Sequence, residues 1–173
     1  MKRRFNSVLI GALALGACAA PVVNSQPAAR AEAAAAIEQK LVFIIRHLQK
    51  AEGDDPSLTP QGAAAAQMLA DMLEDKGITA IFATKTRRAM ETAAPLAKRL
   101  GIPVTPYEPR NPGALVEAAA AARGPILVVG HSNTVHDLVA RFGGAPPAPL
   151  SEEDYGTIFV VEPNGEVDTV EVR

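Results

Sequence analysis

The stretch that decides the fold reads Leu41-Val42-Phe43-Ile44-Ile45-Arg46-His47. Its five apolar residues show no alternation with polar ones, which is typical of a strand buried on both faces. Such strands belong to parallel sheets, and open α/β sheets bind ligands beyond the carboxyl ends of their strands. Arg46 and His47 stand at that end. The pattern alone leaves two interpretations open, a functional site and a strand that simply ends in water.

A second stretch, from Pro125 to Asn133, repeats this design. A β-branched apolar run ends at Gly130, which allows a tight turn, and His131 follows. If the two strands are parallel neighbours, His47 and His131 converge at one edge of the sheet. Two of the three histidines of the chain occupy these equivalent positions, which favours a site over a pair of core histidines.

The rest of the pattern alternates helices with strands. Thr59 as N-cap and Pro60 at the first helical position begin a helix that we expect to end at Gly77. The further elements expected are strands over 78–83 and 104–105, helices over 86–100, 114–122 and 134–142, and a terminal hairpin over 155–161 and 166–172. We therefore predict an α/β fold, a three-layer α/β/α sandwich with a mostly parallel sheet and a C-terminal β-hairpin.

Residues 1–18 have the pattern of a bacterial export signal. Three basic residues precede an apolar segment that is too short to span a bilayer. The segment ends in Leu15-Gly16-Ala17-Cys18, which resembles a lipobox, whose cysteine is lipidated and becomes the mature N-terminus. An ordinary cleavage after Ala19 also fits the small residues and stays open as the alternative.

Residues 19–37 are rich in Ala and Pro and predict a tether, so the folded domain is expected to span residues 38–173. Cys18 is the only cysteine, and the mature domain therefore forms no internal disulfide. Ala19, rather than an aspartate, follows it, which by resemblance to the lipoprotein sorting rule points to the outer membrane. The expected location is the periplasmic side of the cell envelope, anchored to the membrane through lipidated Cys18 or, alternatively, soluble in the periplasm.

Composition excludes several kinds of function. A net charge of −2 and the lack of Trp argue against nucleic-acid binding, which needs a basic face and favours stacking side chains. A domain without cysteine cannot use a thiolate nucleophile. The sequence has no Gly-rich phosphate loop ending in Gly-Lys, and no cluster with metal-ligand spacing. We therefore expect no cofactor and no metal.

Three segments together resemble the signatures of the histidine phosphatase superfamily, also called phosphoglycerate mutase-like. They are Arg46-His47, the segment 84–93 and Gly130-His131-Ser132, and the helix start at 58–62 matches as well. The resemblance extends from Leu41 to about Gly144. It implies a phosphoglycerate mutase-like fold and a metal-independent phosphatase that works through a phosphohistidine.

The resemblance also implies roles for individual residues. His47 is expected to be the nucleophile, and the residues expected to bind the phosphoryl group are Arg46, Arg88 and His131. Two guanidiniums can bind phosphoryl oxygens bidentately, and cations near His47 disfavour its protonated form. Lys50 matches an exported bacterial subgroup that reads Arg-His-Ala-Glu-Lys and is expected to assist the phosphate pocket. Glu108 is the candidate proton donor.

Other polar residues near these motifs are expected to be structural. We expect Arg87 to belong to a solvated helix face and His136 to be a structural or surface histidine. The chain also departs from the family, since Leu48 replaces the usual glycine and Gln49 replaces the glutamate of the exported subgroup.

Three functions follow from these observations. The first is a phosphomonoester hydrolase of the cell envelope, acting on a phosphorylated small molecule such as a sugar phosphate or on protein phosphohistidine. The second is a lipoprotein that binds phosphate without turnover, which the departures at Leu48 and Gln49 leave open. The third, a structural envelope lipoprotein, does not explain the two histidines at strand ends.

Overall fold

The computed structural model describes residue 32 and residues 40–173. The expected export signal, Cys18 and the tether, apart from residue 32, lie outside these residues. Among the described residues, no helix combines the length and the hydrophobicity needed to cross a membrane.

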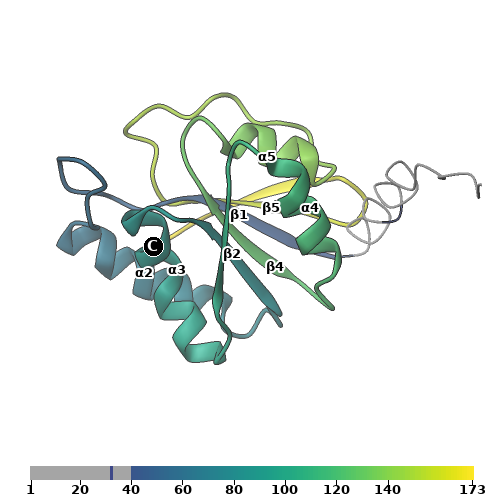
Figure 1. The fold of residues 1–173 in the computed structure, drawn as a ribbon, viewed down its shortest axis with the longest axis horizontal. Helices are drawn as coiled ribbons and strands as arrows, with labels where there is room; N and C mark the ends of the chain where they lie inside the picture. Colours follow the sequence, from purple (N-terminus) through teal and green to yellow (C-terminus); the bar gives the residue numbers. More distant parts are fainter. Residues whose placement is uncertain (1–31, 33–39) are drawn as a thin grey trace, which may run out of the picture.

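A six-stranded sheet in the order β3-β2-β4-β1-β5-β6 forms the centre of the fold (Figure 1). Its strands are β1 (Val42–Arg46), β2 (Ala80–Thr84), β3 (Val104–Tyr107), β4 (Ile126–Gly130), β5 (Thr157–Val161) and β6 (Val167–Glu171). β1, β4, β2 and β3 pair in parallel, whereas β5 is antiparallel to both β1 and β6. The expected mostly parallel sheet and the C-terminal β-hairpin are confirmed.

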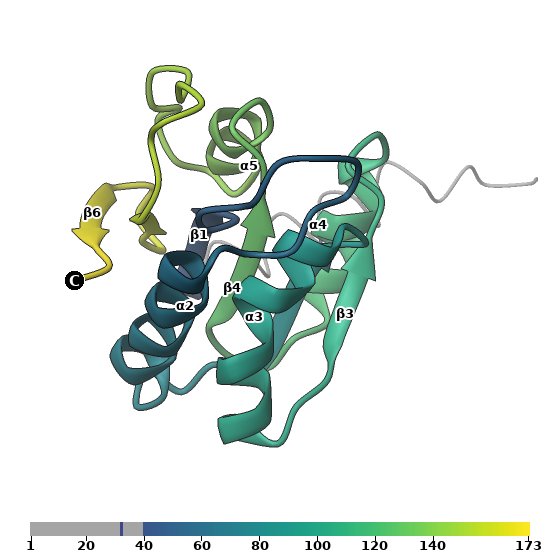
Figure 2. The same cartoon turned by 90° about the vertical axis from the view of Figure 1, so that its left-hand side faces the viewer.

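Helices cover both faces of the sheet, as the alternating pattern predicts. α2 (Pro60–Leu73) and α3 (Arg87–Leu100) lie on one face, and α4 (Pro112–Ala120) and α5 (Val135–Arg141) lie on the other (Figures 1 and 2). Two clusters of buried apolar side chains fill the space between the layers. The three-layer α/β/α architecture is therefore confirmed.

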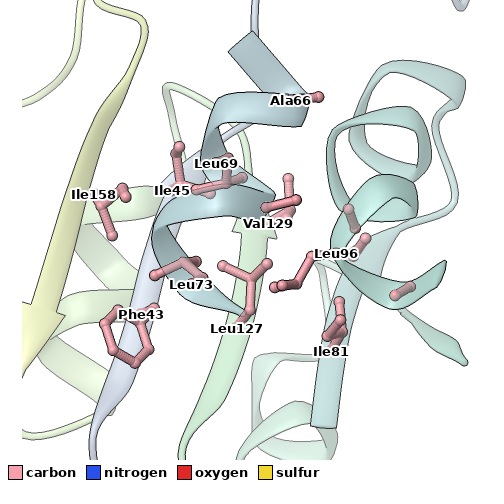
Figure 3. Packing of buried hydrophobic residues seen from close by; sticks show 14 of the residues in the cluster. Phe43, Ile45, Ala66, Leu69, Leu73, Ile81, Leu96, Leu127, Val129 and Ile158 are labelled. Atoms are coloured by element: carbon pink, nitrogen blue, oxygen red, sulfur yellow. The ribbon is translucent and has the colours of Figure 1, made fainter. Parts of the chain in front are cut away.

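The burial of β1 on both faces of the sheet explains why apolar and polar residues do not alternate in its sequence. Phe43 and Ile45 pack under α2 and α3 (Figure 3), while Val42 and Ile44 belong to the cluster on the opposite face. All residues of β1 are buried. A strand in this position buries every side chain, and its apolar run follows from that.

Element boundaries differ from the expected ones where a turn or an edge decides them. α2 ends at Leu73, and Gly77, with a φ of 69°, closes the turn that follows instead of capping the helix. β3 runs through Pro106, which an edge strand tolerates because its outer N–H groups need no partner. α4 begins at Pro112 with Asn111 as N-cap, so Pro112 is the first helical residue and not the end of the loop.

Gly62 fixes the approach of α2 to the loop after β1. A Cβ atom at Gly62 would overlap the backbone carbonyl oxygen of Gln49. The same oxygen accepts the N–H of Thr59 at 2.9 Å, and the Thr59 side chain in turn accepts the N–H of Gly62 at 3.1 Å. The helix start is therefore anchored two residues after His47, and only glycine leaves room for this contact.

Candidate active site

The carboxyl ends of β1 and β4 bring two histidines together. The parallel register pairs Arg46 with Gly130, and the amide of His47 donates to the carbonyl of Gly130 at 2.9 Å. The ring centroids of His47 and His131 lie 5.3 Å apart in an edge-to-face arrangement. The convergence expected from two parallel strands is therefore what the structure contains.

The ring of His47 has a defined tautomer. Its Nδ1 lies 2.9 Å from the carbonyl oxygen of Leu48. Since a carbonyl oxygen can only accept, Nδ1 carries the proton, and in the neutral ring Nε2 holds a free lone pair. Burial lowers the pKa of His47 to about 4, against the hydrogen bond to Leu48, which raises it. The ring is therefore neutral near pH 7, the form that a nucleophile needs.

The backbone around His47 is tied to the core. The amide of Leu48 donates to Thr92 Oγ1 at 3.0 Å, and Thr92 Oγ1 donates to the carbonyl of Arg88 at 2.7 Å. Leu48 itself is fully buried and packs in the cluster under α2 and α3. Leucine in place of glycine thus points into the core, and His47 is held from both sides.

His131 is oriented by Thr84, a residue that the sequence did not single out. His131 Nε2 and Thr84 Oγ1 lie 2.9 Å apart, and Thr84 is the last residue of β2. Burial, followed by the charges of Arg88 and Arg46, lowers the pKa of His131 to about 4. Thr84 could have been found from its place at the end of a strand beside β4, but threonine there is common.

Arg46 is almost fully bonded by one loop. Its guanidinium Nη1 donates to the carbonyls of Ser151 and Asp154 at 2.7 and 3.2 Å. Its Nη2 donates to Glu152 Oε2 and to the hydroxyl of Tyr155 at 3.1 and 3.2 Å. Both Nη groups face the loop in this structure, so the expected bidentate contact of Arg46 with a phosphoryl group is not available through them. Nε, which is buried, has no partner.

Arg88 approaches the site from the first turn of α3. Its Nη1 lies 3.6 Å from Asp55 Oδ1, its side chain is 20 % exposed, and its Nε is buried without a partner. Arg87 is 63 % exposed and 3.9 Å from Glu91, as expected for a solvated helix face. Of the two adjacent arginines, only Arg88 faces the histidines.

Two buried donors have no partner among the described residues, and both belong to arginines whose charges act on His47. Buried N–H groups are almost always bonded, so the Nε–H groups of Arg46 and Arg88 indicate a site for an acceptor. The positive charges of both arginines lower the pKa of His47, which places them near its ring. An anion with several oxygens can bond these donors while it lies in front of His47.

The two remaining predicted residues lie differently. Lys50 is half-buried, and its positive charge contributes to lowering the pKa of Glu152. Glu108 is exposed, and its carboxylate accepts the N–H of Arg110 at 3.4 Å within its own loop. The structure brings Lys50 to the site and gives Glu108 no contact with either histidine among the described residues.

Two side chains of the loop before β5 complete the site. The ring of Tyr155 lies 4.1 Å from the guanidinium carbon of Arg46 and 6.0 Å from the His47 ring. Glu152 bridges Arg46 and Ser132 Oγ, which donates to it at 2.8 Å. Sequence reasoning missed both residues, because a proline-rich loop carries neither periodicity nor a motif.

Part of the chain is similar to a known protein superfamily. Residues 42–109 match the histidine phosphatase superfamily (branch 1). The match contains Arg46, His47 and Arg88, and His131 lies beyond it. The match covers less than half of the chain, and it shows a likeness of this part to the superfamily.

Three solved structures illustrate the shared fold. The protein histidine phosphatase SixA complexed with tungstate is 22 % identical over 75 % of this chain and 94 % of its own, with a TM-score of 0.55. A mycobacterial glucosyl-3-phosphoglycerate phosphatase is 16 % identical over 76 % of this chain and 97 % of its own, with a TM-score of 0.54. YhfR of Bacillus stearothermophilus is 18 % identical over 76 % of this chain and 96 % of its own, with a TM-score of 0.57. At these identities the likeness shows the fold, and the expected phosphoglycerate mutase-like fold is confirmed. A search among curated proteins finds no match to the sequence.

Proposed function

We propose that the protein is a phosphatase that hydrolyses phosphomonoesters through a phosphohistidine on His47. One observation carries the proposal. A buried neutral imidazole, with Nδ1 bonded to a carbonyl and Nε2 free, lies beside two arginines whose Nε–H groups have no partner. A nucleophile and an oxyanion site in one place are the parts that phosphoryl transfer needs.

The proposed reaction has two steps. The lone pair of His47 Nε2 attacks phosphorus, the bond from phosphorus to the leaving oxygen breaks, and that oxygen departs with the bonding pair and takes up a proton. Water then attacks the phosphoryl group on Nε2, the P–N bond breaks, and its electron pair returns to Nε2, which restores the neutral ring. Phosphate is released, and the proton that the water loses replaces the one taken up by the leaving oxygen. Arg46, Arg88 and His131 stabilise the phosphoryl oxygens in both steps, since charge on these oxygens is what the protein has to neutralise.

The departure at Leu48 does not argue against turnover. Its side chain lies in the core and its amide is bonded to Thr92, so the leucine occupies the core and not the binding site. For this reason we favour an enzyme over a lipoprotein that binds phosphate without hydrolysing it. Binding of tungstate or phosphate without any turnover would support the latter.

The proposed substrate is a protein phosphohistidine or a sugar phosphate. Two proteins with this fold act on such groups, the protein histidine phosphatase SixA and the glucosyl-3-phosphoglycerate phosphatase. The connection between β3 and α4 comprises only residues 108–111, so no insertion narrows the site from there. A screen of phosphorylated metabolites and phosphohistidine peptides against the domain from residue 38 onward would identify the substrate class.

The proposed location is the cell envelope. Residues 1–18 are proposed to direct export, Cys18 to carry the lipid, and residues 19–37 to tether the domain of residues 38–173 to the outer membrane. Lipid labelling of the full chain and of Cys18→Ala tests this. Wild-type protein that is unlabelled and recovered wholly from the soluble periplasm would contradict it.

Turnover of an aryl phosphate by wild type and His47→Ala tests the activity itself. We expect turnover by the wild type that survives chelator, because Arg46 and Arg88 supply the positive charge. Acid-quenched wild type should carry an acid-labile phosphate on His47. Equal turnover by both proteins, or activity that follows added divalent metal, would contradict the phosphohistidine mechanism.

A further inference from the structure

The loop before β5 places a carboxylate inside an anion-binding site. Glu152 Oε2 lies 3.1 Å from Arg46 Nη2, and Glu152 Oε1 accepts the hydroxyl of Ser132 at 2.8 Å. The carboxylate therefore bridges the end of β1 and the turn after β4, the two segments that carry the histidines. The Glu152 side chain is 75 % exposed, whereas that of Arg46 is 2 % exposed. Glu152 thus lies on the solvent side of the site.

The charge of Glu152 reaches both histidines. The hydrogen bond from Ser132 and then the charge of Arg46 lower the pKa of Glu152, so it is ionised near pH 7. Its negative charge raises the pKa of His131, against the stronger lowering by burial. The ring of Tyr155, from the same loop, lies 6.0 Å from that of His47, so the loop lies directly beside the nucleophile.

The substrate must meet this carboxylate on its way out of the site. His47 is only 2 % exposed, so a phosphoryl group on its Nε2 is enclosed and the rest of the substrate extends toward solvent. The buried Nε–H groups of Arg46 and Arg88, which have no partner among the described residues, are the proposed donors to the phosphoryl group. Glu152 then lies where the part of the substrate next to the phosphoryl group emerges.

We propose that Glu152 is a specificity-determining residue that disfavours substrates with a second anionic group on the part that extends from the phosphoryl group toward solvent. The proposal rests on the proposed phosphatase function. Repulsion between two like charges about 6 Å apart changes a rate about threefold in bulk water and about a hundredfold at the effective dielectric of a protein surface. Because the Glu152 side chain is 75 % exposed, we expect a value on the order of tenfold. A neutral or cationic group in the same place escapes this repulsion. The positive charge of Lys50, which also reaches Glu152, attracts an anionic group, but it is unchanged when Glu152 alone is replaced.

A matched pair of substrates tests the proposal. Phenyl phosphates with a para-carboxamide or a para-carboxylate differ in charge and little in size. The measurement is the ratio of their kcat/KM values for wild type, Glu152→Gln and Glu153→Gln. Gln keeps the size of the side chain and removes the charge. Glu153 is the matched control, because it is exposed in the same loop and its carboxylate makes no hydrogen bond or ion pair in the described part of the chain.

We expect wild type and Glu153→Gln to prefer the carboxamide on the order of tenfold, and Glu152→Gln to prefer it less than about twofold. An unchanged preference in Glu152→Gln, or an equal loss in Glu153→Gln, overturns the inference. If His47-dependent turnover persists in that case, the proposed function still stands. Wild-type protein whose turnover of either substrate is the same as that of His47→Ala overturns both.

Discussion

Two cations lie at opposite ends of β1, and both donate to backbone carbonyls. Lys40, two residues before the strand, donates from Nζ to the carbonyls of Ala119, Ala120 and Ala122 at 3.2, 3.2 and 2.6 Å. Arg46, the last residue of the strand, donates from Nη1 to the carbonyls of Ser151 and Asp154. In the sequence the two residues look alike, because each is a cation at one end of an apolar run.

Lys40 and Arg46 differ in whether one of their hydrogen-bond donors stays unused. An ammonium has three donors, and Lys40 uses all of them on carbonyls at the C-terminal end of α4, where a positive charge complements the helix dipole. A guanidinium has five donors, and Arg46 keeps its Nε–H free beside a neutral imidazole. Lys40 is therefore a structural contact, because all of its donors are used. Arg46 belongs to a binding site, because one of its donors is unused next to a reactive group.

Replacing the nucleophile should have the largest effect at the carboxyl end of β1. We expect His47→Ala to lose at least about a thousandfold in kcat on an aryl phosphate, because no other group can form the covalent intermediate. Binding of tungstate, followed by calorimetry, should survive because the arginines remain. A variant with more than a tenth of wild-type turnover would contradict the assignment.

Removing the second arginine should have the next largest effect. Arg88→Ala is expected to lower kcat/KM on the order of hundredfold, as for one lost contact to a developing charge. Arg87→Ala is the matched control, since Arg87 is adjacent in sequence but solvated, and it should stay within about twofold of wild type. Similar losses in both variants would show that net charge near the site, rather than the Nε–H of Arg88, is what matters.

Acid should lower both kcat/KM and the free energy of unfolding. The pKa values of His47 and His131 are both lowered to about 4, so kcat/KM should fall on the order of tenfold per pH unit only below about pH 4. Stability should begin to fall earlier. Between about pH 6.5 and 4 the unfolded chain binds protons that the folded rings do not, so the free energy of unfolding decreases as the pH falls. Chemical denaturation and initial rates between about pH 3 and 8 test this, and a rate that halves near pH 6.5 would contradict it.

Removing the structural cation should have the smallest effect. Lys40→Met keeps most of the apolar side chain and removes three hydrogen bonds, which should lower the free energy of unfolding by about 1–2 kcal/mol. Turnover by the folded protein should be unchanged, because the cation lies at the opposite end of the sheet from His47. A tenfold loss of kcat without loss of stability would contradict the distinction drawn between the two ends of β1.

The sequence was sufficient for the parts of the molecule that depend on local pattern. β1 and β4 could be predicted because strands buried on both faces need continuous apolar residues, and the approach of His47 to His131 follows from their parallel pairing. The helix start at Pro60 was predictable because Thr59 and Pro60 satisfy its first donors locally. The end of α2 was not predictable. Gly77 indicates a turn residue in the left-handed conformation, but the helix ends before it.

The contacts of the loop before β5 were not predictable. Ser151, Glu152 and Tyr155 meet Arg46 across more than a hundred residues, and no periodicity links them. The loop packs on Arg46 because a buried guanidinium needs hydrogen-bond acceptors. The sequence shows the arginine, but it does not show which residues supply the acceptors. Thr84 was missed for the same reason, because its partner is a histidine on another strand.

Leu48 has a consequence for how the protein responds to heat. The backbone of His47 can leave its position only if the Leu48 side chain leaves the core, which costs about 2 kcal/mol in addition to the hydrogen bonds of both amides. The nucleophile therefore has no low-energy local opening of its own. Exchange of the amide protons of His47 and Leu48 with solvent should require the sheet itself to open, and on warming the active site should lose its order together with the whole domain.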